Sequence, residues 1–196
     1  MLVGRELQEQ QQIEKVKTHA AQLRQSARTL NIMSIAENLR IQNERVTAAC
    51  SATGRDPSSV RLIAVSKLKP IAAIEEAYAA GQRDFGENYV QELLKKRAAL
   101  EHLPDLRFHL IGQLQTKKCR QIVDQVASVQ TVDSLKLVQE LAKRAAAKRL
   151  PTDGPLNIML EVHLSDEESK GGCTEAELPE LVNATMQAPC LTLKGL

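Results

Sequence analysis

Aromatic side chains are scarce in this chain of 196 residues, and tryptophan is missing altogether. Aromatic residues make up 2% of the sequence, and all of them fall in one central stretch, at Tyr78, Phe85, Tyr89 and Phe108. Aliphatic side chains must therefore build the hydrophobic core, and a hydrophobic fraction of 43% supplies enough of them. A basic stripe interleaved with aromatic residues, as in many nucleic-acid-binding proteins, is excluded by the same scarcity.

The chain also lacks an excess of either charge and any long apolar run. Its 26 Lys and Arg residues nearly balance its 24 Asp and Glu residues, so the net charge is +2. No apolar run approaches the ~20 residues of a membrane-spanning helix, and the first residues lack the apolar core of a secretory signal. We expect a monomer with no nucleic-acid partner and no membrane partner.

Clustered cysteine and histidine residues are a third absence. The cysteines are far apart in the sequence, at Cys50, Cys119, Cys173 and Cys190. No pair has the spacing of a metal site, and a disulfide framework is not expected in a chain of this length. The histidines are equally scattered, at His19, His102, His109 and His163. We predict free thiols in a reducing, cytoplasmic compartment and no metal site.

Residues 1–31 differ in composition from the rest of the chain. They are rich in glutamine and carry the whole net charge of +2, which favours a loosely attached, helix-prone extension. A mitochondrial transit peptide is the alternative, although such peptides are poor in acidic residues and this segment has three glutamates. Ser34 and Glu37 then form a capping-box pattern that starts a helix near Ile35 and opens the main domain, residues 32–196.

From Leu62 onward, strand patterns alternate with helix patterns. Strands are predicted at 62–66, 83–86, 107–111, 128–132 and 156–162, and a sixth begins at Leu191. Helices are predicted at about 70–80, 88–100, 116–125 and 134–148, with a last one that starts at Pro179 and ends before Ala188. This alternation predicts parallel strands with right-handed crossovers, in a TIM-like barrel or in a doubly wound sheet.

A missing motif and the number of strands bear on these two folds. No GxGxxG motif follows the first strand, which argues against a dinucleotide-binding doubly wound sheet. A complete barrel has eight strands and typically about 250 residues, whereas this chain supplies five strands and stops inside a sixth. A strand at the end of the sequence, with no helix after it, indicates an interrupted βα unit in either fold. Residues 191–193 should pair beside 156–162, and the edge at 62–66 should be open.

Lys67 ends the first predicted strand, directly after the apolar run 62–65. Functional groups of parallel barrels gather at the C-terminal ends of the strands, and a lysine amine there can form a Schiff base with a carbonyl ligand. The alternative is a solvated lysine that only terminates the strand. Lys69 is the internal comparison, because it should lie in the loop and face water.

Five polar motifs at successive strand ends carry more information together than any one of them alone. They read AVSK at 64–67, FGENYVQE at 85–92, FHLIGQLQ at 108–115, QTVDS at 130–134 and SDEESKGG at 165–172. In this order and spacing, they resemble the pyridoxal phosphate homeostasis protein family from about residue 61 to residue 196. The resemblance implies an α/β fold of the parallel TIM-like barrel type, similar to the N-terminal domain of alanine racemase. It further implies that the barrel is incomplete here, as in a C-terminally truncated product, and that pyridoxal 5′-phosphate (PLP) is the cofactor.

By the same resemblance, Lys67 occupies the position of the lysine that holds PLP as a Schiff base. The implied role is not enzymatic: the protein binds PLP, buffers its reactive aldehyde and supplies it to PLP-dependent apoenzymes. One alternative is a PLP-dependent amino-acid racemase or decarboxylase, which would need an acid or base on the other face of the ring. The other is a truncated chain that no longer binds PLP.

Asn88 and His109 complete the expected cofactor-binding residues. Asn88 follows the second strand, and it either hydrogen-bonds the cofactor or caps the next helix. His109 lies within the third strand, and it either packs near the cofactor ring or serves as a buried, hydrogen-bonded core residue. Glu87 is expected to form a structural salt bridge rather than to act as a general base.

Two departures from the family pattern bear on these expectations. Gln113 stands where the family usually has a histidine, which removes an ionisable group from the loop after the third strand. The phosphate-binding segments that follow the sixth strand in the family have no counterpart in these 196 residues.

Overall fold

The computed structural model describes residues 33–164 and 171–196. Within them, six parallel strands form one sheet in the order β1-β2-β3-β4-β5-β6. The strands are β1 (Ala64–Val65), β2 (Asp84–Glu87), β3 (Arg107–Leu110), β4 (Ser128–Val132), β5 (Leu156–Leu160) and β6 (Leu191–Gly195). A strand order that follows the sequence without reversal is that of a barrel and not of a doubly wound sheet, so the expected fold class is confirmed.

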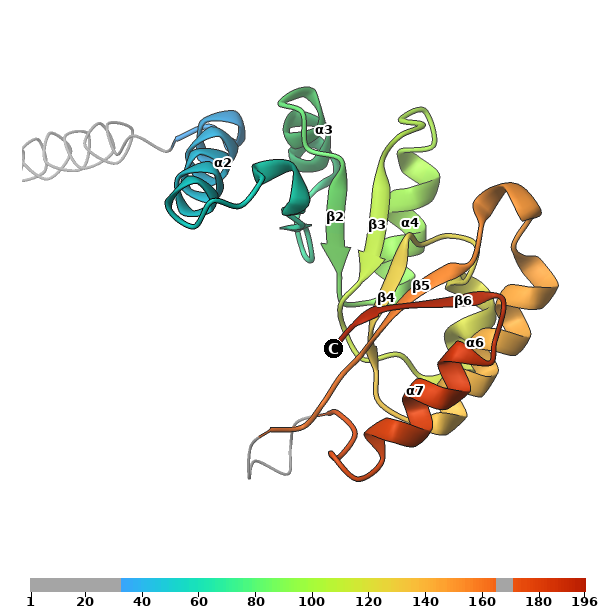
Figure 1. The fold of residues 1–196 in the computed structure, drawn as a ribbon. Helices are drawn as coiled ribbons and strands as arrows, with labels where there is room; N and C mark the ends of the chain where they lie inside the picture. The colour runs from blue at the N-terminus through green and yellow to red at the C-terminus, as the bar shows by residue number, and fades with distance from the viewer. Residues whose placement is uncertain (1–32, 165–170) are drawn as a thin grey trace, which may run out of the picture.

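Helices connect the strands and cover one side of the sheet. The α-helices are α2 (Ile35–Ala52), α3 (Ile71–Ala79), α4 (Val90–Ala99), α5 (Cys119–Ile122), α6 (Leu135–Lys148) and α7 (Leu178–Met186). Three short 3-10 turns are η1 (Pro57–Ser59), η2 (Thr116–Lys118) and η3 (Pro151–Asp153). Figure 1 shows α4, α6 and α7 on the same side of the twisted sheet. Over residues 33–164 and 171–196, no helix is both long and apolar enough to span a membrane.

All six predicted strands are confirmed, with ends shifted by one or two residues. The helix predicted at 116–125 is wrong as a continuous element, because η2 is a 3-10 turn and only the four residues of α5 are α-helical. The capping box is half formed: Ser34 Oγ accepts a hydrogen bond from the Glu37 N–H at 3.1 Å, but the Glu37 carboxylate pairs with Arg40. The predicted extension at 1–31 and the motif residues 165–170 lie outside the described residues.

The hydrophobic core lies between the sheet and its helices. Phe85 and Phe108 occupy neighbouring strands with 6.4 Å between their ring centroids, and each is 1% exposed. Around this pair the core is aliphatic, as the low aromatic content predicts; Leu110, Ile158 and Leu160 are at most 1% exposed. Every second strand residue therefore points into this core, and the residues between them point to the opposite face.

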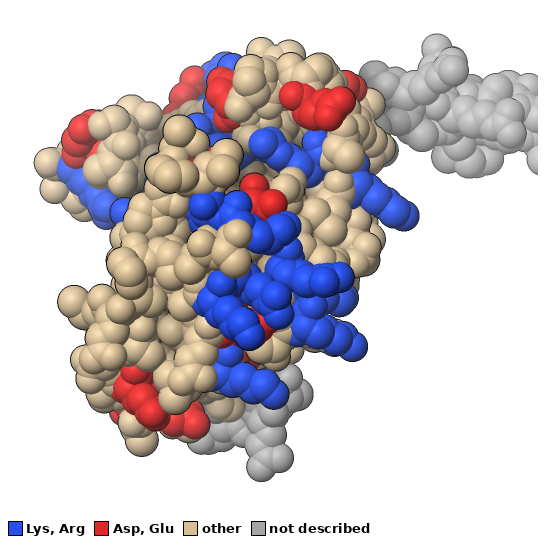
Figure 2. All heavy atoms as spheres, turned by 90° about the vertical axis from the view of Figure 1, so that its right-hand side faces the viewer, with Lys and Arg blue, Asp and Glu red and all other residues tan. Residues whose placement is uncertain are grey.

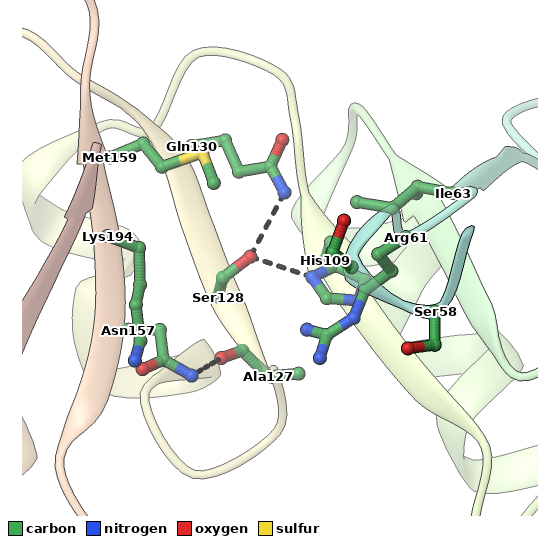
Figure 3. A pocket seen from close by; sticks show the side chains of 11 residues that line it. Ser58, Arg61, Ile63, His109, Ala127, Ser128, Gln130, Asn157, Met159 and Lys194 are labelled. Carbon is green, nitrogen blue, oxygen red and sulfur yellow. Dashed lines mark hydrogen bonds between the residues drawn. The ribbon is translucent and has the colours of Figure 1, made fainter. Parts of the chain in front are cut away.

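The opposite face of the sheet is polar and surrounds a cavity of about 400 Å³. Figure 3 shows His109 of β3 hydrogen-bonded to Ser128 of β4, with Gln130 bonded to the same hydroxyl. Arg61 reaches this cavity from the chain before β1, and Lys194 reaches it from β6. The sheet thus presents its interior, barrel-side face to this cavity and its exterior face to the helices.

Strands β1 and β6 form the two edges of the sheet described here. Leu191 is the register partner of Leu156, and Thr192 is the partner of Asn157. The expected pairing of 191–193 beside 156–162 is therefore confirmed. In the described part of the chain, β1 pairs with β2 alone, so the strand that precedes Lys67 is an open edge, as expected.

Charge is distributed unevenly over the surface although the net charge is small. Figure 2 shows Lys and Arg side chains gathered on one face of the molecule, the side on which α6 lies in Figure 1. Exposed basic residues of η2, α5 and α6 are Lys117, Arg120, Lys136, Lys143 and Lys148. Two acidic residues lie among them, because Asp124 pairs with Lys148 at 3.0 Å and Glu140 pairs with Arg144 at 2.6 Å.

Candidate functional site

Lys67 and Asn88 lie at the C-terminal ends of β1 and β2. The two strands are parallel, and Val65 is the register partner of Gly86. Lys67 and Asn88 each follow that pair by two residues, so the fold brings them to the same edge of the sheet. Lys67 is exposed. Lys69 is exposed as well, as predicted for a loop residue that faces water.

A tight turn with an unusual backbone carries Lys67. The Ser66 N–H donates to the Gly86 carbonyl at 2.9 Å, and the Lys69 N–H donates back to the Ser66 carbonyl at 3.0 Å. Leu68 has a φ of 60°, in the left-handed region, which costs a residue with a β-carbon roughly 1–2 kcal/mol. Strain of this kind persists only where neighbouring groups hold the backbone in place.

A buried ionic network lies beneath this turn. The Lys96 ammonium donates to the Ser66 carbonyl at 2.7 Å, to Glu87 Oε1 at 2.8 Å and to Glu92 Oε1 at 2.7 Å. Ser66 Oγ donates to the same Glu87 oxygen at 2.6 Å. The Glu87 side chain is 0% exposed and that of Lys96 is 6% exposed. The salt bridge expected for Glu87 is therefore confirmed.

The same network reaches the peptide group after Lys67. The Leu68 N–H donates to Glu92 Oε1 at 2.7 Å. The hydrogen bond from Lys96 lowers the pKa of the Glu92 carboxyl, the Leu68 N–H lowers it further, and its desolvation opposes them. Glu92 is thus a carboxylate at neutral pH and accepts both bonds. Sequence reasoning missed Lys96 and Glu92 as neighbours of the site, although their i, i+4 spacing on a helix was a usable signal.

Asn88 does not cap the helix that follows it. The residue at the N-cap of α4 is Tyr89, and no side chain makes a capping hydrogen bond there. The Asn88 Oδ1 atom is buried and has no hydrogen-bond partner. The capping alternative is therefore wrong, and a buried acceptor at a strand end is left for another donor to satisfy.

Gly112 fixes the backbone of Asn88 from the neighbouring strand end. A β-carbon at Gly112 would lie 2.6 Å from the Asn88 Cα, closer than real β-carbons approach other atoms. Only glycine allows the chain after β3 to pass this close to the end of β2. The glycine of the motif at 108–115 therefore has a packing role that positions Asn88.

His109 occupies a hydrogen-bonded position on the barrel-side face. Its Nε2 lies 2.8 Å from Asp84 Oδ1, and its Nδ1 lies 2.7 Å from Ser128 Oγ. Desolvation lowers the pKa of His109, although Asp84 opposes this shift. Desolvation also raises the pKa of Asp84, but hydrogen bonds from Arg107 and His109 outweigh it and leave the pKa below its usual value.

These contacts match the core alternative for His109. A neutral imidazole with hydrogen on Nε2 donates to the Asp84 carboxylate and accepts from the Ser128 hydroxyl, so both ring nitrogens are used. The ring lines the cavity shown in Figure 3. Any contact between His109 and a ligand at the strand ends would be packing rather than hydrogen bonding.

Glu161 is a further ionisable residue of the same sheet face, and the sequence analysis did not single it out. It follows β5, and alternation places it on the face of Asn157 and Met159, which line the cavity. Its Oε2 atom is buried without a hydrogen-bond partner. Burial raises the pKa of Glu161, and the nearby charge of Asp133 raises it further.

The sheet and the residues at its strand ends define a class of protein. A parallel α/β barrel sheet, a lysine amine at the C-terminal end of its first strand and a buried, unsatisfied acceptor on the next strand suit a carbonyl-bearing cofactor. The model of the family described as "Alanine racemase, N-terminal domain" matches residues 30–196. An alanine racemase from Streptomyces coelicolor has the same fold, with a TM-score of 0.64, 25% identity, and coverage of 83% of this chain and 40% of that one.

Closer relatives identify the family. The pyridoxal phosphate homeostasis protein of Pseudomonas aeruginosa is 49% identical over 163 residues, which are 83% of this chain and 69% of the relative. That of Escherichia coli K12 is 42% identical over 164 residues, 83% of this chain and 68% of the relative. This chain belongs to the pyridoxal phosphate homeostasis protein family.

A solved structure adds the ligand of a relative. PipY of Synechococcus elongatus, solved with PLP bound, is similar in structure, with a TM-score of 0.64 and 39% sequence identity. The match covers 77% of this chain and 68% of the PipY chain. The resemblance read from the five motifs is thereby confirmed. The share of these relatives that the chain spans is about two thirds.

Proposed function

We propose that this protein binds PLP in PLP homeostasis and holds it as a Schiff base on Lys67. Its family and the PLP-bound relative support the cofactor. The observation that carries the choice of residue is the placement of Lys67, whose exposed side chain follows β1 at the edge where functional groups of parallel barrels gather.

The residues present fit the cofactor in two respects. Lys67 offers an amine that can condense with the PLP aldehyde, so that a C=N bond forms between the Lys67 nitrogen and the aldehyde carbon and one water leaves. Asn88 offers a buried amide oxygen with no hydrogen-bond partner, which a donor on the ligand would satisfy. His109 is level with Gly86, one layer of side chains below Asn88, and it would offer packing rather than a hydrogen bond to a bound ring.

The role that we propose for the bound cofactor is storage and supply rather than catalysis. PLP supplies a reactive aldehyde when bound, and a reversible bond to Lys67 would keep that aldehyde from other amines while allowing transfer to PLP-dependent apoenzymes. The enzymatic alternative, an amino-acid racemase or decarboxylase, gains one specific feature from Glu161, whose carboxyl holds a proton more readily than usual. The two roles make different predictions for turnover.

The test compares the wild-type chain with Lys67→Ala and with the matched control Lys69→Ala, since both lysines are exposed in the same loop. After PLP is added, the wild type and Lys69→Ala should develop the visible absorbance of a Schiff base, and borohydride should fix PLP to the peptide that contains Lys67. Equal labelling of Lys67→Ala would overturn the proposal. Racemisation of alanine or release of carbon dioxide from amino acids would favour the enzyme instead.

A further inference from the structure

The peptide groups on both sides of Lys67 are bound by side chains of α4. Before Lys67, the Ser66 carbonyl accepts from Lys96 at 2.7 Å. After it, the Leu68 N–H donates to Glu92 at 2.7 Å. Lys96 and Glu92 are themselves joined at 2.7 Å, one helical turn apart. The turn that carries Lys67 is therefore held at two points by one ion pair.

The hydrogen bonds of this network lead to the turn that carries Lys67. Helix α4 follows β2, so its N-terminal turns lie at the same end of the sheet as Lys67. Glu87, at the end of β2, holds the Lys96 ammonium at 2.8 Å and receives the Ser66 hydroxyl at 2.6 Å. Each residue of this network thus contacts either the backbone next to Lys67 or a residue that does so. A network that served only helix stability would not need the Leu68 N–H.

Leu68 shows why such support is required. Its φ of 60° is unfavourable for leucine, and its side chain is 80% exposed, so packing of that side chain does not hold the turn. The bond from the Lys69 N–H to the Ser66 carbonyl closes the turn itself, and the bond from the Leu68 N–H to Glu92 is the contact from another element that favours this conformation. Without it, the turn can relax to ordinary backbone angles, which would change the direction of the Lys67 side chain.

We propose that Glu92 and Lys96 are positioning residues that hold the turn of Lys67 in the conformation that binds the cofactor. This inference rests on the proposed function, because it assigns Lys67 as the residue that bonds to PLP. It adds that the amine is preorganised before the ligand arrives. A preorganised group loses less conformational entropy on binding, so loosening the turn should weaken binding without removing the lysine.

The test uses Glu92→Ala, with Gln91→Ala as the control from the adjacent position of α4, because the Gln91 side chain bonds to Gln121 and not to the turn. In the protein without PLP, hydrogen exchange at the Leu68 amide should become about ten-fold faster in Glu92→Ala, because a hydrogen bond to a charged group is lost. The dissociation constant for PLP should rise about five- to ten-fold. Gln91→Ala should leave both quantities unchanged.

A conservative variant separates geometry from a general loss of structure. In Glu92→Gln, an amide oxygen can still accept from the Leu68 N–H, so it should restore most of the exchange protection and most of the PLP affinity. The absorbance of the Schiff base should reach the wild-type amplitude at saturating PLP in all variants that retain Lys67. Failure of Glu92→Gln to recover either quantity would argue against the role of this hydrogen bond.

The outcomes distinguish this inference from the function beneath it. If Lys67→Ala binds PLP like the wild type, the proposed function fails and the inference fails with it. If Lys67→Ala loses the Schiff base while Glu92→Ala matches the wild type in exchange and in affinity, the function stands and the positioning role is overturned. Faster exchange at Leu68 with unchanged PLP affinity would overturn the positioning role as well.

Discussion

The substitution Lys96→Met tests most directly how much the buried ionic network contributes to the free energy of unfolding. Lys96 and Glu87 form an ion pair at 2.8 Å with side chains that are 6% and 0% exposed. One oxygen of Glu87, Oε2, already lacks a hydrogen-bond partner. In Lys96→Met, the Glu87 carboxylate would remain buried with the Ser66 hydroxyl as its only donor.

The expected loss of stability depends on whether one partner or both partners of the buried ion pair are replaced. Removal of one partner from such a pair costs about 3–5 kcal/mol, because an uncompensated charge stays inside the protein. For a chain of this size, each kcal/mol lowers Tm by roughly 2–4 °C, so Lys96→Met should melt roughly 6–20 °C below the wild type. Replacing both partners, in Glu87→Met with Lys96→Met, removes the buried charge and should recover most of the loss.

Urea denaturation and thermal unfolding of the wild type, both single variants and the double variant complete the cycle. Lys95→Met is the matched control, because the neighbouring lysine on α4 is exposed, and it should change the free energy of unfolding by no more than ~0.5 kcal/mol. A loss below about 1 kcal/mol for Lys96→Met would refute the reasoning, since it would mean that the pair is solvated in solution. A double variant as unstable as Lys96→Met would refute the assignment of the cost to the unpaired charge.

Four further predictions concern single side chains. Folding lowers the pKa of His109, so the unfolded chain binds a proton at a higher pH than the folded protein does, and the free energy of unfolding should fall as pH drops below ~6.5. In thermal melts, the fall in Tm with decreasing pH should be shallower for His109→Gln than for the wild type. An equal fall in Tm in the two proteins would contradict this prediction. Burial raises the pKa of Glu161, so the contribution of this carboxyl to stability is present below pH ~4.3 and is lost as pH rises through its pKa in the folded protein. At pH 8, Glu161→Gln should therefore have a higher Tm than the wild type. A lower Tm for the variant would count against this prediction. Burial raises the pKa of the Cys119 thiol to about 11, so Ellman's reagent at pH 8 should leave Cys119 unmodified in the native protein and label it after unfolding. Gly112→Ala places a β-carbon against the backbone of Asn88 and should cost about 1–3 kcal/mol in urea denaturation, whereas a neutral result would show that the strand ends can separate.

Much of the fold could be predicted from the sequence because its signals are local. Strand β1 ends an apolar run, and β3 to β6 each carry two or more large apolar residues, whereas β2 (DFGE) has one. Together with the apolar stripes of the helices, these patterns predict the order of elements and the parallel sheet. The segment predicted as a helix at 116–125 does bury its apolar residues Cys119, Ile122 and Val123, but only the four residues of α5 are α-helical. What the pattern could not show is the 3-10 turn before Cys119, which depends on how the chain enters from β3.

The site was predictable only in part, for a different physical reason. Lys67 stands out because it ends a strand, and Asn88 because it ends the next. The burial of Glu161 and the bonds from Lys96 and Glu92 depend on contacts between elements that are distant in the sequence, such as Lys96 with Ser66, 30 residues apart. Hydrophobic periodicity along the sequence does not indicate which distant polar residues meet, so these contacts are seen only in the three-dimensional structure.

The buried network also indicates which part of the chain holds the turn of Lys67 in its conformation. The side chains that hydrogen-bond to this turn in the described part of the chain are those of Glu87 at the end of β2 and of Glu92 and Lys96 in α4. If Lys67 bonds to the cofactor as proposed, attachment of a carbonyl to its amine should depend on this part of the chain, whereas the phosphate-binding segments expected from the family follow the sixth strand. Covalent capture and phosphate affinity should then be separable: pyridoxal, which lacks the phosphate, should label Lys67 with the same sensitivity to Glu92→Ala as PLP does. If Glu92→Ala weakened PLP labelling but left pyridoxal labelling unchanged, α4 would act on the phosphate and not on the amine.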